Sequence, residues 1–320
     1  MPTPSLTERI SKMQKFQQRL SGARLAFCAV ACAAVINPAV SAVSAVSAAA
    51  AAAAGDDALP SELRVCAAAD ELPYSGKDQP GFENTIATII GEGMNRPVTF
   101  TWSDKPAIYL VRDYLDKGKC DLIMGVDTRD PRVATSQPYY RSGYAFVYRK
   151  DRNLDITNWH SPDLKKLDRF AMVFGTPAEV MLKKIGRFET TFNYMHSLSN
   201  FKSRRNEYIR VDPARIIGEV ASGKADIAVV FAPEAARYIK EYDDKLKVVM
   251  IPDSNVRSDG MPVPFQYNQS MAVRKGDKAL LKEVNEAIDK RRGDITAVLK
   301  GEGIPLLPIG DGGNTRSAQQ

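Results

Sequence analysis

Few side chains in this sequence have the chemistry that catalysis at neutral pH requires. There are two histidines, His160 and His196, and both lie in polar, loop-like stretches without a candidate nucleophile or a metal-ligand spacing beside them. Neither a Gly-x-Ser-x-Gly elbow nor a His-Glu-x-x-His motif occurs. No paired Cys-x-x-Cys arrangement supports a zinc site. The sequence therefore predicts a protein that is not an enzyme and that uses neither a metal nor a cofactor.

Three acids, Glu83, Asp127 and Asp130, are the candidates for a general acid–base pair. Asp130 opens the stretch Asp-Pro-Arg, which is first of all a turn signal. A structural role for these acids is therefore favoured over a catalytic one.

The first fifty-odd residues have the composition of an export signal. Residues 1–24 carry five basic side chains against one acid, and residues 25–36 (LAFCAVACAAVI) form an apolar segment. Three Val-Ser-Ala repeats follow, each an acceptable cleavage site. The apolar segment is too short to cross a bilayer as a stable helix, which disfavours a membrane anchor. We expect residues 1–54 to be a signal peptide with an Ala-rich cleavage region, and the mature protein to be periplasmic.

The mature chain is expected to be nearly neutral. The full sequence has 44 basic and 38 acidic residues, and removing the five basic residues and one acid of the leader leaves 39 and 37. No basic block with interleaved aromatic residues stands out. Nucleic acid is therefore excluded as a partner.

Two of the four cysteines lie in the apolar segment of the leader, which leaves Cys66 and Cys120 in the mature chain. An even pair in an exported chain favours a disulfide, because the periplasm is oxidising. The alternative is two separately buried thiols.

Five aromatic residues are expected on loops that face one crevice, and they are candidates for the wall of a binding cleft. They are Tyr74, Phe82, Tyr139, Tyr140 and Phe231. The alternative for each is packing between domains, because aromatic rings are commonly buried in cores.

The elements that must position these residues alternate between strands and helices, which indicates parallel sheets with crossover helices. Residues 63–68 read as a strand and residues 120–126 as a short strand covered on both faces, and apolar residues at helical spacing predict a helix over 82–93. The pattern restarts after residue 150 and repeats in a second set. Further expected elements are a helix at 108–115, a helix opening at 175–179, a helix at 212–222, a strand at 225–231, a loop at 252–268 and a strand at 270–274.

Two successive α/β sets predict two lobes, each a central sheet flanked by helices, joined by two crossing strands. Ligands bind beside the carboxyl ends of parallel strands in such folds. We therefore expect function on the loops that follow residues 68, 126, 175 and 231.

Several stretches resemble the periplasmic solute-binding proteins of the polar-amino-acid type. They are LRVCAAADELPYS, CDLIMGVDTRDPRVATSQPYY, FGTPAEVML, GKADIAVVFAPEAARYI and SMAVRKGDKALLKEVNEAI. More narrowly, the sequence resembles the MxaJ family of the methanol-oxidation system in methylotrophic bacteria. That resemblance is carried by KPAIYLVRD, YYRSGYAFV, NFKSRRNEYIRVDPARI, VRSDGMPVPFQYNQS and EGIPLLP.

The resemblance covers residues 63–308 and implies the type II periplasmic-binding-protein fold. Lobe 1 is expected to contain residues 63–150 and 269–308, and lobe 2 residues 151–268. Residues 309–320 are expected to be a disordered tail.

The resemblance also assigns expected roles in a ligand site. In amino-acid binders the strand that matches residues 223–231 typically ends in an acid that holds the ligand ammonium, and here that position is Phe231. An arginine clamps the ligand carboxylate in these families, and Arg129 and Arg132 are both candidates for it. Thr176 and the backbone amides that open the following helix match the second carboxylate contact. Structural alternatives are a helix cap for Thr176, and for Arg132 a helix cap or a pairing with an acid of its own loop.

Because the ammonium anchor is missing, the sequence argues against ordinary amino-acid transport. The resemblance implies an accessory protein that assists assembly, maturation or activation of the quinoprotein methanol dehydrogenase, its expected partner. The alternative is a transporter-linked binding protein for an amino acid or small carboxylate.

Overall fold

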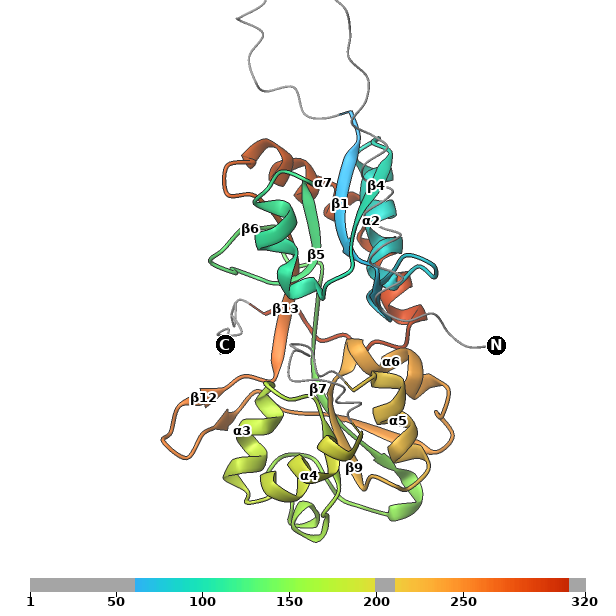
Figure 1. The fold of residues 1–320 in the computed structure, drawn as a ribbon, viewed down its shortest axis with the longest axis vertical. Coiled ribbons are helices and arrows are strands. Elements are labelled where there is room, and N and C mark those ends of the chain that lie inside the picture. Colours follow the sequence, from blue (N-terminus) through green and yellow to red (C-terminus); the bar gives the residue numbers. More distant parts are fainter. Residues whose placement is uncertain (1–60, 199–210, 311–320) are drawn as a thin grey trace, which may run out of the picture. The chain divides into compact units, whose positions relative to one another are not determined.

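The computed structural model describes residues 61–198 and 211–310, and Figure 1 shows how their elements are arranged. The expected signal peptide and all but the first two residues of the expected tail lie outside these ranges. The elements below keep the labels of Figure 1.

A nine-stranded mixed sheet runs through the described chain. Seven of its strands follow the order β4-β1-β5-β13-β7-β9-β8, while β6 pairs with β13 and β10 with β7. Their bounds are β1 Leu63–Ala68, β4 Val98–Ser103, β5 Leu122–Asp127, β6 Ala134–Thr135, β7 Tyr140–Arg149, β8 Phe170–Met172, β9 Ile227–Phe231, β10 Leu246–Met250 and β13 Gln266–Val273.

The first part of the sheet is parallel and is covered by helices. Strand β1 pairs in parallel with β4 and with β5, and five of its six residues are buried. Helix α2 (Phe82–Gly93) and helix α7 (Lys278–Gly301) belong to this part, shown beside β1 in Figure 1. The expected helix over 82–93 is therefore confirmed residue for residue.

Strands β7 and β13 connect this part of the sheet with the next. Strand β13 is antiparallel to both β5 and β7, and β7 is antiparallel to β9 and β10 as well. Both strands are long and largely buried.

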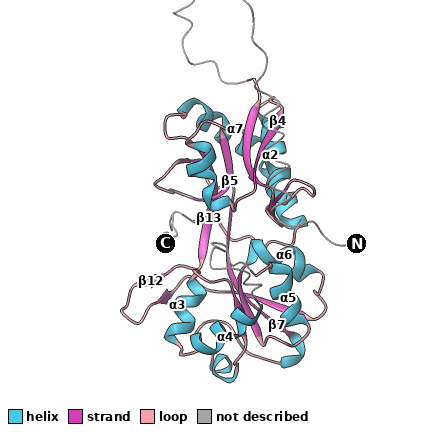
Figure 2. Cartoon of the chain, viewed as in Figure 1, coloured by secondary structure: helices cyan, strands magenta, loops and turns pink. Residues whose placement is uncertain are grey.

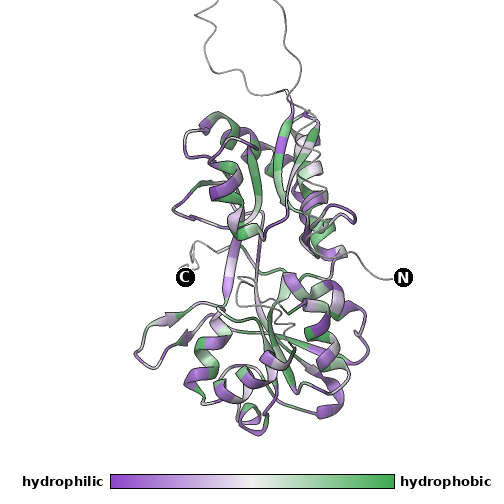
Figure 3. Ribbon diagram, in the orientation of Figure 1, coloured by the Kyte–Doolittle hydropathy of each residue, from purple (hydrophilic) through white to green (hydrophobic). Residues whose placement is uncertain are grey.

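The remaining helices pack around β8, β9 and β10. They are α3 Pro177–Lys184, α4 Phe188–Leu198, α5 Pro213–Ala221 and α6 Ala232–Lys240. Each carries its buried residues on one side, and Figure 3 shows hydrophilic and hydrophobic residues alternating along these helices. Strands and their covering helices are distinguished by colour in Figure 2.

The buried apolar residues form two large clusters. One draws its members from the chain between Tyr144 and Tyr267. The other combines residues from Leu63 to Tyr140 with residues from Met271 to Ile304, plus Ala236. A smaller third cluster surrounds the disulfide.

A disulfide joins Cys66 and Cys120, with a Cα–Cα distance of 5.5 Å that lies in the usual range. Both residues are buried. The disulfide expected from the cysteine count is confirmed.

Three segments differ from the sequence expectation. The expected helix at 108–115 is a 3₁₀ turn at Ala107–Tyr109 followed by a π-helical turn at Val111–Leu115. The expected loop at 252–268 contains a small hairpin of β11 (Asn255–Val256) and β12 (Pro262–Val263) and the start of β13. Helix α4 was not expected, and its first half contains two β-branched threonines, which lower helix propensity.

Candidate functional site

The loop after β1 is held in place by a buried asparagine. The side-chain oxygen of Asn84 accepts hydrogen bonds from the amides of Gly76 (3.0 Å) and Gly81 (2.9 Å), and its amide group donates to the Ser75 hydroxyl at 3.0 Å. The Ser75 hydroxyl in turn donates to the carbonyl of Ala68 at the end of β1. The loop therefore has a fixed conformation beside the start of α2.

This loop places two of the expected cleft residues against each other. The rings of Tyr74 and Phe82 lie 5.2 Å apart at a tilted angle, and the Phe82 amide donates to the carbonyl of Pro73. Phe82 is almost completely buried, whereas Tyr74 is half-buried. Tyr74 also packs against both large core clusters.

Tyr139 and Tyr140 lie at the beginning of β7 and belong to the same core cluster as Phe82. Their rings meet edge to face at 4.9 Å, and both residues are buried. Burial, the nearby carboxyl of Glu83 and the neighbouring Tyr140 raise the pKa of Tyr139 above its ordinary value. Tyr139 therefore stays a neutral phenol.

Glu83, the second residue of α2, lies beside this aromatic group. Its carboxylate occupies the space where a side chain at Gly125 would begin, and Gly125 itself has a left-handed φ of 63°. Burial, and to a smaller extent the negative charge of Glu71, raises the pKa of Glu83 from 4.5 to about 8. The carboxyl is therefore largely protonated at neutral pH.

The two candidate arginines both lie on the surface. Arg129 is exposed, has a left-handed φ of 67°, and donates its backbone amide to the Thr135 hydroxyl. Arg132 pairs with Asp130 through its Nη2 at 2.7 Å and its Nε at 3.1 Å. For Arg132 the structure shows the acid pairing that was the alternative to ligand binding.

Thr176 precedes α3, as the cap signal predicted, but its hydroxyl does not cap the helix. It donates instead to the carbonyl of Val173 at 2.7 Å. The amide of Gly175 donates to the carboxylate of Glu179 at 2.9 Å, and Lys183 pairs with the same carboxylate at 2.6 Å. The Glu179 carboxylate therefore accepts a hydrogen bond from the Gly175 amide, which was expected among the amides that contact a ligand carboxylate.

Phe231 ends β9 and is only 5% exposed. Its ring lies 5.3 Å from the ring of Tyr144 and 6.2 Å from that of Tyr267, and Phe265 meets Tyr144 at 5.6 Å. The ring is therefore part of an aromatic core.

The structure thus brings four expected residues into one group, which we call the aromatic group: Tyr74, Phe82, Tyr139 and Tyr140. Phe231 lies in the other large cluster, and Tyr74 packs against both. That these residues bind a ligand or a peptide stays a prediction.

Comparison with known proteins identifies the family. The family model of the bacterial extracellular solute-binding proteins, family 3, matches residues 63–298. This chain belongs to that family.

Two relatives named Protein MoxJ match most of this solute-binding protein. The one from Methylorubrum extorquens is 50% identical over 247 residues, covering 77% of this chain and 82% of its own length. The one from Paracoccus denitrificans is 45% identical over 248 residues, covering 78% and 90%. The crystal structure of MxaJ from Methlophaga aminisulfidivorans MPT is 56% identical, covers 77% of this chain and 100% of its own, and has a TM-score of 0.73. The resemblance to MxaJ and the fold class are confirmed.

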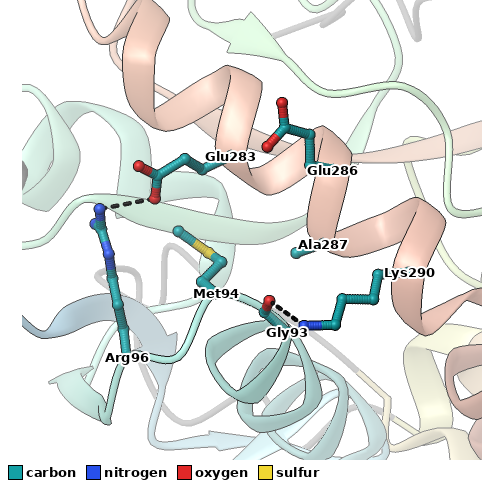
Figure 4. Close-up of a pocket in the computed structure, with 7 residues that line it drawn as sticks. All are labelled: Gly93, Met94, Arg96, Glu283, Glu286, Ala287 and Lys290. Carbon is teal, nitrogen blue, oxygen red and sulfur yellow. Dashed lines mark hydrogen bonds and ion pairs between the residues drawn. The ribbon is translucent and has the colours of Figure 1, made fainter.

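A hollow lies between the end of α2 and helix α7 of this solute-binding protein, as Figure 4 shows. Its volume is about 420 Å³. Across it Arg96 pairs with Glu283 at 2.7 Å, and Lys290 donates to the carbonyl of Gly93 at 3.3 Å. The residues that line it are Gly93, Met94, Arg96, Glu283, Glu286, Ala287 and Lys290. None of the expected site residues is among them.

Sequence reasoning treated Glu83 only as a weak catalytic candidate and gave Asn84 no role. The signal for Asn84 was its place in Gly-Phe-Glu-Asn before a helix, where an amide side chain is able to return to the preceding backbone. Nothing in the sequence indicates that Gly125 lies against Glu83, because that contact depends on tertiary structure.

Proposed function

We propose that this chain is a periplasmic accessory protein of methanol oxidation, which assists the assembly, maturation or activation of the quinoprotein methanol dehydrogenase. The similarity to the MoxJ and MxaJ proteins supports the link with methanol oxidation. Within the described residues, no helix is both long and apolar enough to cross a membrane.

The observation that carries this proposal is the environment of Phe231. The residue at the end of β9 is an apolar ring packed against Tyr144 and Tyr267 and 5% exposed. An amino-acid binder needs a carboxylate at this strand end for a charge-assisted bond to the ligand ammonium. With a buried phenyl ring in its place, the amino-acid site lacks one of its two anchors.

The carboxylate anchor is weakened as well. Arg132 is paired with Asp130 on the surface, and the amide of Gly175, just before α3, donates to the Glu179 carboxylate. Two contacts expected to hold a ligand carboxylate are therefore made within the chain. This supports a role other than ordinary solute uptake.

In this proposal the fold has two lobes, residues 63–150 with 269–308 and residues 151–268. The two large core clusters support the division, because one lies within 144–267 and the other combines residues before and after that stretch. Strands β7 and β13 cross between the lobes. A peptide segment of the dehydrogenase engages the aromatic group or the surface beside it.

A pull-down of the tagged mature protein from methanol-grown periplasm tests the partner. We expect the dehydrogenase subunit among the captured polypeptides, identified by mass. The matched control is an unrelated periplasmic solute-binding protein carrying the same tag, which should not capture it. No capture, together with a melting temperature that rises with an amino or organic acid, would instead establish solute binding, since ligands stabilise the state they bind.

A further inference from the structure

Glu83 is a shielded acid with an unusual environment. It is half-buried on the first turn of α2, and its carboxylate lies against the backbone of Gly125. The buried acid Asp121, by contrast, has cationic partners, because it pairs with Arg64 at 2.7 Å and with Arg274 at 2.9 Å. In the described residues, Glu83 makes no ion pair.

The groups that act on Glu83 offer no positive charge. The negative charge of Glu71 acts on it, and the other titratable groups of the cluster are the phenols of Tyr139, Tyr140 and Tyr74. Shielding a carboxylate from water without a countercharge costs free energy. Such a group is therefore stabilised either by binding a proton or by pairing with a cation.

The surroundings of this carboxyl resemble the places where proteins hold ammonium groups. Aromatic faces beside a carboxylate attract a cation through the ring quadrupole as well as through the ion pair. The rings of Tyr74 and Phe82 meet at a tilted angle, 5.2 Å apart, and Phe82 directly precedes Glu83 in α2. The buried hydroxyl of Tyr139 lies by the Gly125 backbone and, among the described residues, has no hydrogen-bond partner at normal geometry.

Gly125 keeps this arrangement open. A Cβ at this position would meet the Glu83 carboxylate and force it to move aside, and the left-handed φ of 63° favours glycine independently. The carboxylate is therefore accommodated by the one residue type without a Cβ.

We propose that Glu83 is the cation anchor of this protein and receives a primary alkylammonium group beside the aromatic group. The group comes either from a lysine side chain of the protein partner or from a free amine. The inference places the anchor on the α2 side of the aromatic group, whereas the amino-acid binders have theirs at the end of β9. The lysine source rests on the proposed function, and the free-amine source does not.

Binding of the cation releases a proton. The neutral carboxyl of Glu83 loses its proton to solvent, and the resulting carboxylate pairs with the ammonium, so charge and atoms balance. Because the pKa of Glu83 is about 8 without a cation, binding at neutral pH is accompanied by proton release and strengthens as the pH rises toward 8.

A carbon-detected NMR titration of the Glu83 carboxyl tests the anchor directly. The mature protein is labelled at its glutamate side chains, and Glu83→Gln assigns the resonance. Titrations are compared in n-butylammonium chloride and in sodium chloride at equal concentration. We expect the pKa of Glu83 to be at least about one unit lower in n-butylammonium, a tenfold preference for the ionised form. The matched control is the carboxyl of Glu286, an exposed acid on α7, which should titrate alike in both salts. Identical titrations of Glu83 in the two salts would overturn the anchor.

Capture of the dehydrogenase by Glu83→Gln and by the control Glu286→Gln separates the two sources. A lysine of the partner is identified if Glu83→Gln loses capture while Glu286→Gln keeps it, and if acetylating the lysines of the dehydrogenase also abolishes capture. Unchanged capture together with the n-butylammonium shift identifies a free amine. If neither Glu83→Gln nor Glu286→Gln captures the dehydrogenase but n-butylammonium lowers the pKa of Glu83, the proposed function fails and the anchor stands.

Discussion

The carboxylate of Glu83 occupies the position at which any side chain on Gly125 would begin. One residue belongs to the start of α2 and the other to β5, so the contact ties a helix start to a strand within the first part of the sheet. The contact also limits which side chains positions 83 and 125 can carry.

Replacing Gly125 by alanine should destabilise the protein. The left-handed backbone costs a residue with a Cβ about 1–2 kcal/mol, and displacing the carboxylate of Glu83 adds to that. Urea unfolding measures the loss. In the double variant with Glu83→Ala the collision part should disappear while the backbone part remains. The control Gly276→Ala, where nothing lies within 4 Å of the added Cβ, should change stability little. Equal losses in the two glycine variants would contradict the contact.

Replacing Glu83 by glutamine should alter how stability depends on pH. The pKa of Glu83 is about 8 in the folded protein and ordinary in the unfolded chain, so the folded state binds more proton between about pH 4.5 and 8. The free energy of unfolding of the wild type should therefore fall as the pH rises through this window. Glu83→Gln should not show this fall. Its free energy of unfolding should exceed that of the wild type by almost nothing near pH 4.5 and by a few kcal/mol above pH 8, at about 1.4 kcal/mol per unit of pKa shift.

Chemical unfolding of both proteins at pH 4.5, 7 and 9 measures this difference. Glu286→Gln is the control, because that acid is exposed on α7. Parallel pH profiles for wild type and Glu83→Gln would show that the carboxyl is ionised in the folded protein.

Phe231 should tolerate an apolar replacement but not a charged one. Its ring packs against Tyr144 and Tyr267 in the core, so Phe231→Leu should cost about 1 kcal/mol. Phe231→Asp buries a carboxylate and should cost several kcal/mol more. Thermal unfolding monitored by circular dichroism compares the two. An aspartate variant as stable as the leucine variant, with amino acids raising its melting temperature, would show that this strand end opens to a ligand.

The disulfide should contribute substantially to stability. The cysteines are 54 residues apart in the chain, and closing a loop of this length removes unfolded-state entropy equivalent to about 4 kcal/mol. The double variant Cys66→Ala/Cys120→Ala should lose stability of that order in denaturant titrations. Reducing agent should lower the stability of the wild type and leave that of the double variant unchanged. An equal effect on both proteins would show that the reducing agent does not act through this disulfide.

The parts of the fold with clear periodicity could be predicted from the sequence. Apolar residues at helical spacing predicted the helix over 82–93, and the largely apolar stretch 63–68 was predicted as a strand, which is β1. The segment at 108–115 has the same spacing, but apolar spacing does not distinguish an α-helix from successive 3₁₀ and π turns. The hairpin of β11 and β12 was missed because strands of two residues have no period to detect.

The candidate site was harder to predict, because its relationships are tertiary. The sequence singled out Tyr74, Phe82, Tyr139 and Tyr140, and the structure gathers them in one group. It did not indicate that Arg132 would pair with Asp130 rather than turn inward, since both possibilities satisfy the same charges. The raised pKa of Glu83 comes from burial that only the assembled sheet and helix provide.

The way the core around Phe82 is assembled has a consequence for the order of folding during synthesis. That core takes residues from the beginning of the described chain and from Met271 to Ile304 near its end, whereas the buried members of the core around Phe231 all lie between Tyr144 and Tyr267. A ribosome delivers the N-terminal half first. The core around Phe82 is therefore completed only when nearly the whole described chain has been made, after the segments that form the core around Phe231.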